Sequence, residues 1–463
     1  MNHLSTVKIE NRKQLIHNSD TPLLLKGRTL ALGSLEYALA AADPQKLTKA
    51  KVKIENQKLK AATNTFDLKE LRNIYVVGGG KASGKMAEAI EELLGNRIID
   101  GAVNVPHGIK PRTRFIKLHE ADHPTPSEVG AEGTRRIMEI ARKARQDDLI
   151  ICLISGGGSS LMPLPLEGVS IKDKIELTKL LLKSGAGIRE INAVRKHISA
   201  FKGGWLAKTA YPATVLNLVL SDVVGDSLEF IASGPTVPDS STFSDARKVL
   251  EKYYLWNKAP ASVRDVLLDG EKGSIKETPK EGDIAFKKVY SVILGNNRTA
   301  ALAACKYLKK EDLNTILLTS SLEGEARHVG TMLGSIANEI AVTGNPIARP
   351  AAVVIGGETT VAVKGEGMGG RNQELALSAA LKLTGTDGIV VASLSTDGID
   401  GPTTAAGAIV DRNTLARAKR LGMDASVCLT ENNSYNFFSR IEDLIVTGWT
   451  GTNVNDISLV IVL

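Results

Sequence analysis

Short apolar runs and longer amphipathic stretches alternate along this chain. The runs are typical of buried strands, whereas apolar residues that recur every three or four positions are typical of helices. In the first half, strands are predicted at the start of 74–86 and at 100–105, 115–118, 148–154 and 213–220. A predicted helix over 127–145 separates two of these strands. This order favours βαβ units, which build a mainly parallel, Rossmann-like sheet.

The hydrophobic pattern also indicates how the chain divides. A length of 463 residues favours two domains. Residues 268–288 lose the pattern and are charged, so we predict the boundary there. Residues 1–285 then form a Rossmann-like N-terminal domain, and 286–463 form a second α/β domain that begins with the strand VYSVILG. Because ligands of open α/β sheets bind at the carboxyl ends of strands, we expect the active site in the cleft between the two domains.

Other segments are predicted to be scaffold. Residues 21–47 have helical spacing, and this helix is expected to pack on the first sheet. Residues 49–69 are rich in lysine and are expected to be solvated. In the second half, AAVVIGGETTVAV predicts a strand, a Gly-Gly turn and a return strand, and 388–394 predicts another strand. The end of the chain, 444–463, is interpreted as a last strand pair with no evident chemistry.

The stretch 74–86 reads IYVVGGGKASGKM and predicts a strand, a glycine turn and a helix. Glycines let backbone N–H groups approach a ligand, and a helix N-terminus adds positive potential, so a phosphate site is predicted at Gly79 and Gly80. The stretch is not a nucleotide P-loop, because Met86 stands where that motif needs Ser or Thr. Ser83 breaks the dinucleotide pattern GxGxxG. The alternative is a tight turn with an exposed lysine.

A second glycine loop, SGGGSS, follows the strand over 148–154. Glycines flanked by hydroxyl groups offer N–H and O–H donors together, a pattern that suits anions. The candidate residues are Ser155, Gly156, Gly157, Gly158, Ser159 and Ser160. The nearby loop HEADHPTPSEVG is interpreted as a site loop or as a connection ordered by prolines, and for each of its histidines the second interpretation is favoured. Arg195 lies on a predicted helix, where a charged face is usually only solvated.

Acidic residues follow two of the predicted strands. Asp222 and Asp226 lie in SDVVGD, after the strand over 213–220. Asp397 and Asp400 lie in a glycine loop after the strand over 388–394. Paired carboxylates there can hold a hard divalent cation with phosphate oxygens, or one can accept a proton. The alternative is an ordinary turn, because each of these two aspartates precedes a glycine.

The second half adds four polar candidates. Asn296 follows a predicted strand, and Glu358 lies in the Gly-Gly turn. Arg371 and Asn372 stand at or near the start of a helix, after the glycine-rich loop GEGMGG. An arginine held there can clamp phosphate or carboxylate in bidentate fashion.

Composition narrows the class of partner. The net charge of +7 is modest, basic residues are scattered and aromatic residues make up 4%, so a small anionic substrate is favoured over nucleic acid. Three widely spaced cysteines show no metal or disulfide spacing, which favours a reducing cytoplasm. The sequence has neither a signal-peptide core at its N-terminus nor an apolar run long enough for a membrane span. A homo-oligomer is possible.

Glycine cradles, basic residues and carboxylates that all follow strands suit phosphoryl transfer, in which positioning and charge neutralisation do most of the catalysis. The chain from residue 20 onwards also resembles the glycerate 2-kinase family, the class whose C-terminal part is called the MOFRL domain. The resemblance rests on these blocks in order: VVGGGKASGKMAEAI, HPTPSEVG, LISGGGSSLMPLP, NAVRKHISAFKGG, LSDVVGD, ASGPTVPD, GGETTVAVKGEGMGGRNQELAL and STDGIDGPTTAAGAIVD. It implies ATP-dependent phosphorylation of D-glycerate at the 2-hydroxyl, with Mg²⁺ or another divalent cation.

The resemblance implies that Lys81 and Arg371 are catalytic, and we assign both to the transferring phosphate. From the residues themselves we assign Arg195 to the glycerate carboxylate. Asp222 is expected to be the general base or a metal ligand, with Asp397 as its competitor. The other expected assignments are metal binding by Asp226, Asp397 and Asp400, and substrate or nucleotide binding by Gly79, Gly80, residues 155–160, Asn296, Glu358 and Asn372.

Two departures from the family pattern bear on these roles. Ser127 and Thr404 stand where the family commonly has aspartate, and the second loss makes a metal role beside Asp400 less secure. Two other functions stay open. A hydroxypyruvate reductase that uses NAD(P)H is disfavoured by the broken GxGxxG pattern. A non-catalytic protein that binds small anions would use the same basic residues.

Overall fold

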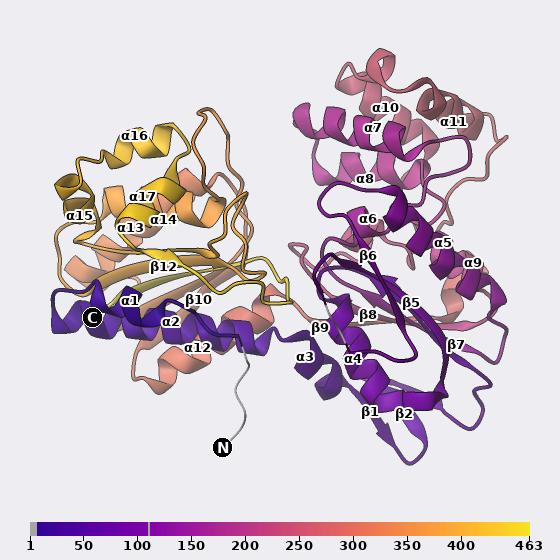
Figure 1. Ribbon diagram of the computed structural model, residues 1–463, viewed down its shortest axis with the longest axis horizontal. Coiled ribbons are helices and arrows are strands. Elements are labelled where there is room, and N and C mark those ends of the chain that lie inside the picture. The colour runs from indigo at the N-terminus through magenta and orange to yellow at the C-terminus, as the bar shows by residue number, and fades with distance from the viewer. Residues whose placement is uncertain (1–6, 110–111) are drawn as a thin grey trace. The chain divides into compact units, whose positions relative to one another are not determined.

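The computed structural model describes residues 7–109 and 112–463, which divide into two compact α/β units (Figure 1). Unit 1 comprises Met1–Asp43 and Gly295–Leu463, and unit 2 comprises Pro44–Leu294. Residues 1–6, where the segment predicted to lack a signal peptide begins, lie outside the described residues. The predicted α/β class is confirmed. The expectation of an active site in a cleft between domains stays a prediction.

Unit 2 is built on a six-stranded sheet of order β6-β5-β4-β7-β8-β9. Its strands are β4 (Ile74–Gly79), β5 (Ile98–Pro106), β6 (Lys117–Ala121), β7 (Leu149–Ile154), β8 (Thr214–Leu220) and β9 (Val289–Gly295). Neighbouring strands from β6 to β8 are parallel, which confirms the Rossmann-like prediction. Every residue of β7 is buried, as expected of a central parallel strand covered on both faces.

The helices of unit 2 fall into two groups. α4 (Ser83–Leu94), α5 (Glu128–Lys143), α6 (Gly158–Leu161) and α9 (Trp205–Ala210) lie along the sheet. α7 (Ile171–Lys183), α8 (Ile188–His197), α10 (Phe243–Lys252) and α11 (Ala261–Glu271) enclose a separate apolar core and form a helical subdomain (Figure 1). Short 3₁₀ turns follow at η1 (Gly95–Arg97), η2 (Ile231–Ser233), η3 (Trp256–Lys258) and η4 (Ile284–Lys288).

The lysine-rich segment over 49–69 was expected to be solvated, and most of its lysines are exposed, but the strands that it forms were not predicted. The segment continues α3 (Pro44–Lys51) into a three-stranded antiparallel sheet of β1 (Val52–Glu55), β2 (Lys58–Ala61) and β3 (Asn64–Asp67). Val52, Leu59 and Ala61 are buried, while Lys53 and Lys58 between them are exposed and Lys60 is half-buried. Alternation of apolar and charged residues is the strand signal that the lysine content obscured.

Unit 1 contains a second six-stranded sheet, of order β10-β11-β15-β12-β13-β14. Its strands are β10 (Asn314–Leu322), β11 (Ala351–Gly357), β12 (Ile389–Ser395), β13 (Gly407–Asp411), β14 (Leu444–Ile445) and β15 (Asp456–Val462). The strand nearest the C-terminus, β15, is central and pairs antiparallel with both β11 and β12. The predicted return strand after Gly357 does not form, because residues 358–370 contain only an isolated bridge at Thr360.

Helices cover the unit 1 sheet. α2 (Pro22–Ala41) contacts α12 (Asn297–Lys310) and the strands β12 and β15, whereas α13 (Ala326–Thr343) packs with α14 (Arg371–Lys382) on the sheet (Figure 1). The remaining helices are α1 (Arg12–His17), α15 (Thr414–Arg420), α16 (Ala425–Thr430) and α17 (Ser434–Arg440). Among the described residues, no helix is both long enough and apolar enough to cross a membrane.

The predicted place of the N-terminal helix was wrong, since α2 packs on the second sheet rather than the first. Arg28 of α2 is fully buried and donates from Nε to Asp411 at 2.7 Å and from Nη1 to Asp443 at 2.8 Å. Both carboxylates are also fully buried. A buried arginine needs carboxylate partners, and these stand near the C-terminus, so the helix joins unit 1.

The units also differ from the predicted division at residue 285. The strand expected to open the second domain, β9, is instead the edge strand next to β8 in the first sheet. The division therefore falls between Leu294 and Gly295. The segment over 268–288, where the boundary was predicted, contains the end of α11, a connection and η4, all within unit 2, and its residues Thr278 and Ala285 are buried.

Replacing Arg28 by Met should destabilise unit 1 by about 3–5 kcal/mol, because two buried carboxylates lose their counter-charge. Urea unfolding of the full chain measures this change. Arg420→Met, at an exposed position of the same unit, is the matched control and should lie within about 0.5 kcal/mol of the parent. Equal stability of the two variants would contradict the role assigned to the Arg28 cluster.

Candidate functional site

The two glycine loops of unit 2 are packed against each other at the carboxyl edge of the sheet. Gly78 and Gly80 both have positive φ, near +145°, in the strand-to-helix turn between β4 and α4. A Cβ on Gly80 would lie 2.2 Å from Ser155 Oγ, and a Cβ on Gly78 would lie 2.1 Å from the carbonyl oxygen of Leu153. These glycines therefore let the loop after β4 lie directly on β7 and the loop that follows it.

Backbone N–H groups of the first loop are bonded within the protein. The N–H of Gly80 donates to the carbonyl of Asn104 at 3.1 Å, and that of Lys81 donates to the carbonyl of Gly156 at 2.8 Å. The N–H of Ala82 donates to Ser155 Oγ at 3.0 Å. This pattern is that of a packed structural turn. The assignment of Gly79 and Gly80 to a phosphate stays a prediction, and these three donors do not support it.

The second loop borders a cavity of about 220 Å³ in unit 2. The cavity lies where the helical subdomain meets the loops that follow β6 and β7. Its lining consists of Pro124, Pro126, Gly157, Ser159, Ser160, Pro163, Lys174, Thr178, Leu182, Arg195 and Lys202. Three residues predicted in SGGGSS and the predicted Arg195 are thus brought together. Ser155 lies apart from the cavity because its hydroxyl bonds to Ser83 Oγ and to the Ala82 N–H.

Three basic side chains line this cavity, and none of them forms a salt bridge with a described carboxylate. Lys174 and Lys202 are 4% and 1% exposed. Lys174 Nζ donates to the carbonyl of Pro163 at 3.0 Å, and Lys202 Nζ donates to that of Ser159 at 2.9 Å. Burial lowers the pKa of Lys174 to about 7, and it lowers the pKa of Lys202 and of Arg195 below their ordinary values. Buried cations without counter-charge favour an anion in this space.

Other predicted residues of unit 2 lie near the same loops. A Cβ on Gly157 would lie 3.0 Å from the ring of His123 and 3.2 Å from Cγ of Lys81, so both side chains lie against this loop. Ser159 Oγ hydrogen-bonds to Ser233 Oγ at 2.8 Å. Asp222 and Asp226 follow β8 and are half-buried. The loops after β4, β6, β7 and β8 thus share the carboxyl edge, as predicted for a parallel sheet.

Arg371 begins α14 in unit 1 and is held by two carboxylates. Its Nε and Nη2 donate to Asp456 at 2.5 and 2.9 Å, and Nη1 lies 2.9 Å from Glu358 Oε1. Burial alone would lower the pKa of Arg371, but the charge and hydrogen bonds of Asp456 outweigh it and raise the pKa above its ordinary value. Arg371 is therefore always charged, and its planar fork is fixed in orientation.

Asp400 caps the N-terminus of α14, the helix that begins at Arg371. It accepts hydrogen bonds from the N–H groups of Asn372 and Gln373, at 3.1 and 2.9 Å, which are otherwise unpaired at a helix N-terminus. Burial, with the charge of Asp456 as a further cause, raises the pKa of Asp400 to about 6. Asp397 accepts from Ser395 Oγ and from the N–H of Ile399.

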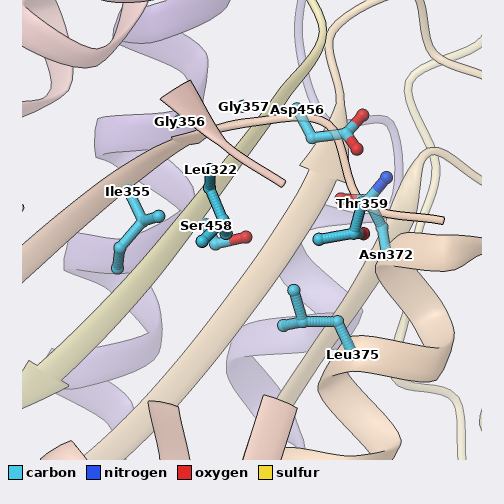
Figure 2. Close-up of a pocket in the computed structure, with 9 residues that line it drawn as sticks. All are labelled: Leu322, Ile355, Gly356, Gly357, Thr359, Asn372, Leu375, Asp456 and Ser458. Carbon is cyan, nitrogen blue, oxygen red and sulfur yellow. The ribbon is translucent and has the colours of Figure 1, made fainter. Parts of the chain in front are cut away.

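The remaining candidates in unit 1 have structural partners. Asn296 caps α12 by accepting from the N–H of Thr299, and Asn372 Oδ1 accepts from Ser393 Oγ at 2.6 Å. A pocket next to Asn372 and Asp456, walled by Leu375 and Thr359 (Figure 2), has only about 10 Å³ of space, room for a single water. This pocket is too small for any part of a nucleotide.

Among the described residues, no group of three or more His, Cys, Asp or Glu is arranged to hold a metal ion. Because Mg²⁺ keeps several waters and needs only one or two carboxylates beside phosphate oxygens, this finding concerns an all-protein cage and not a metal bound with a nucleotide. Asp400 fits a metal poorly, since both its oxygens accept N–H groups of α14. The metal roles of Asp226, Asp397 and Asp400 stay predictions.

Sequence reasoning missed three residues. Lys174 lies in IKDKIELTKLLLK, where one more lysine on an amphipathic helix gives no signal. Lys202 lies in the charged stretch that carries Arg195 and was assigned no role, and Asp456 lies in the C-terminal stretch judged to have no chemistry. The polar residues at the start of β15 could have indicated Asp456, because the candidate aspartates that were predicted also lie at the ends of strands.

Comparison with known proteins places the whole chain in one family. Residues 30–268 match the family described as "Domain of unknown function (DUF4147)", and residues 351–456 match the MOFRL family. The glycerate 2-kinase of Pyrococcus horikoshii is 43% identical over 94% of this chain and 97% of its own length. A protein of Agrobacterium vitis with a provisional hydroxypyruvate reductase name is 42% identical over 84% of this chain and 98% of its own.

A solved structure shares the fold. The crystal structure of glycerate kinase from Thermotoga maritima superposes with a TM-score of 0.81 at 42% identity, over 94% of this chain and 99% of that one. Similarity of this extent covers both units and all the predicted loops. The chain therefore belongs to the glycerate 2-kinase family with a C-terminal MOFRL domain.

Proposed function

We propose that this protein transfers the γ-phosphoryl group of ATP to the 2-hydroxyl of D-glycerate, giving 2-phosphoglycerate and ADP. The observation that carries the proposal is the set of three cations around a cavity at the edge of the first sheet, the buried Lys174 and Lys202 and the half-buried Arg195, in a chain 43% identical to a protein named glycerate 2-kinase. A small anionic acceptor needs such a cavity, because only a counter-charge offsets the burial of these side chains.

In the proposed reaction, the 2-hydroxyl oxygen of glycerate attacks the γ-phosphorus as the bond to the ADP oxygen breaks. Asp222 accepts the hydroxyl proton, with Asp397 as the competing candidate. Lys81 and Arg371 neutralise charge on the transferring group, and Arg195 binds the glycerate carboxylate. Asp456 and Glu358 are positioning residues that fix the orientation of the Arg371 fork.

A divalent cation, when bound with ATP, neutralises the phosphate oxygens. A single carboxylate beside the phosphates is sufficient to bind the cation, and Asp226 or Asp397 is better suited to this role than Asp400.

We further propose that the protein works in the cytoplasm, since Cys152, Cys305 and Cys428 are all free. A homo-oligomer stays a prediction that sedimentation equilibrium would test.

The reductase alternative is disfavoured by the first glycine loop. In a dinucleotide site the N–H groups of this loop face the pyrophosphate, whereas here those of Gly80, Lys81 and Ala82 are bonded to the protein. Only a measurement of turnover distinguishes the kinase from a non-catalytic protein that binds small anions.

The first experiment incubates the protein with ATP, Mg²⁺ and D-glycerate, and adds enolase without phosphoglycerate mutase. Absorbance of phosphoenolpyruvate is expected, because enolase accepts only the 2-phosphorylated product. A signal that needs added mutase would mean transfer to the 3-hydroxyl. No signal in either case, with NADH consumed on hydroxypyruvate, would support the reductase, and no reaction at all would support the binding protein.

Arg371→Lys keeps the charge but loses the fork that pairs with Asp456, so kcat should fall by at least about 100-fold. Steady-state kinetics with both substrates measures this loss. Lys382→Met, at the exposed far end of α14, is the control and should retain the parent kcat. Activity of Arg371→Lys within a few-fold of the parent would remove Arg371 from the transfer step.

Asp222→Asn preserves size and removes the charge that accepts the proton, so kcat should fall by about 100- to 10,000-fold. Asp397→Asn, measured in parallel, identifies the base by the larger loss. A near-normal kcat for Asp222→Asn, combined with a large loss for Asp397→Asn, would transfer the role to Asp397.

A further inference from the structure

Two lysines with no assigned role lie at the cavity between the helical subdomain and the glycine loop 155–160. Lys174 comes from α7, and Lys202 comes from the chain between α8 and α9. Both are almost completely buried, yet each contacts only backbone carbonyl groups among the described residues. A lysine bonded to one or two carbonyls retains further N–H donors, because an ammonium group has three.

Burial of these charges is unfavourable unless a counter-charge is present. Burial lowers the pKa of both lysines, and the neighbouring charge of Arg195 lowers each further. The Arg195 guanidinium donates no hydrogen bond to any described residue. An anion that accepts from all three side chains therefore stabilises their charged forms.

The size of the cavity selects the anion. Its volume of about 220 Å³ corresponds to roughly seven waters at about 30 Å³ each. A three-carbon hydroxy acid with seven non-hydrogen atoms fits this space, whereas a nucleotide does not. Four of its lining residues are apolar, Pro124, Pro126, Pro163 and Leu182, which suits the carbon chain of such an acid.

The cavity is also next to a residue proposed to act on phosphate. Gly157 lines the cavity, and the Lys81 side chain lies against the same glycine. An acid bound in this cavity therefore lies beside the loop that also contacts Lys81, the residue assigned to the transferring phosphate.

We propose that Lys174 and Lys202, together with Arg195, form the carboxylate-binding site for the acceptor, and that this cavity limits the acceptor to a hydroxy acid of about three carbons. The proposal rests on the proposed function in that the acceptor is the acid that becomes phosphorylated. Phosphate groups have the same acceptor chemistry as carboxylate, so the experiment separates these two sources.

The test measures binding of D-glycerate alone, without ATP, by titration calorimetry, and then steady-state kinetics. Lys202→Met should weaken D-glycerate binding and raise its KM by about 10- to 100-fold, through loss of a charge-assisted hydrogen bond. The KM for ATP should stay within twofold of the parent. Lys174→Met should have the same effect, whereas Lys179→Met, at an exposed position of α7, should have none.

Arg195→Gln covers the case in which a lysine variant fails to fold, because the Arg195 guanidinium has no described hydrogen-bond partner to leave unpaired. It should also raise the KM for D-glycerate selectively, and Arg195→Lys should restore part of the affinity. Unchanged D-glycerate binding in folded Lys202→Met and Arg195→Gln would overturn the proposal. A selective rise in the KM for ATP, or competition by inorganic phosphate with ATP but not with glycerate, would assign the cavity to phosphate instead.

The two proposals fail in different ways. D-glycerate that binds without turnover, and binds more weakly to Lys202→Met, would support the carboxylate site and reject the kinase. Turnover with a parent-like KM in all three variants would support the kinase and reject the carboxylate site.

Discussion

The site in unit 2 depends on a contact between two backbones. At Gly78 and Gly80 the loop after β4 approaches β7 and its loop so closely that a Cβ would lie within 2.2 Å of neighbouring atoms. Hydrogen bonds from Lys81 to Gly156 and from Ala82 to Ser155 then bind the two loops together, and the N–H of Gly80 attaches the first loop to Asn104 of β5. Because both loops are fixed to each other and to parallel strands, the Lys81 side chain and the border of the cavity keep a constant relationship. Gly78 and Gly80 thus have a packing role: they let the two loops pack together, and the packed loops form the border of the cavity where a ligand can bind.

Cations are balanced in two ways in this protein: some pair with carboxylates, as Lys196 of unit 2 does with Glu229 and Asp239, and others do not. In unit 1, Arg371 is held by Asp456 and Glu358, and Arg28 is held by Asp411 and Asp443, so the protein supplies the counter-charge itself. Around the cavity of unit 2, Lys174 and Lys202 donate only to carbonyl oxygens, and Arg195 donates to no described residue. The first arrangement fixes a geometry, and the second leaves a charge for a ligand to balance. The reason is the cost of desolvation. A buried cation that has no carboxylate partner is unfavourable in the folded protein unless a bound anion compensates for the lost solvation.

Much of the fold was predictable because strands and helices have local signals. The strands of the first sheet, the helix over 127–145 and the α/β class were predicted correctly from runs and periodicity. The placement of α2 and β9 was not, because their sheets are chosen by partners remote in sequence: Asp411 and Asp443 for α2, and β8 for β9. Arg195 and three residues of SGGGSS were found through motif and family resemblance, whereas Lys174 gave no local sign of its burial. Motifs identify loops, but charge balance in a cavity emerges only when the helix positions are known.

The connectivity explains why unit 1 contains such a demanding ion cluster. Unit 2 is one continuous segment, Pro44–Leu294, inserted between α2 and the rest of unit 1. The contacts of Arg28 with Asp411 and Asp443 span 383 and 415 residues. Closing a loop of this length costs conformational entropy, although the cost grows only logarithmically with length. Docking of α2 at another position would leave a buried arginine and two buried carboxylates without their partners, so the cluster specifies one docking position for α2. The chain thereby covers the sheet of unit 1 with a helix from its N-terminal end.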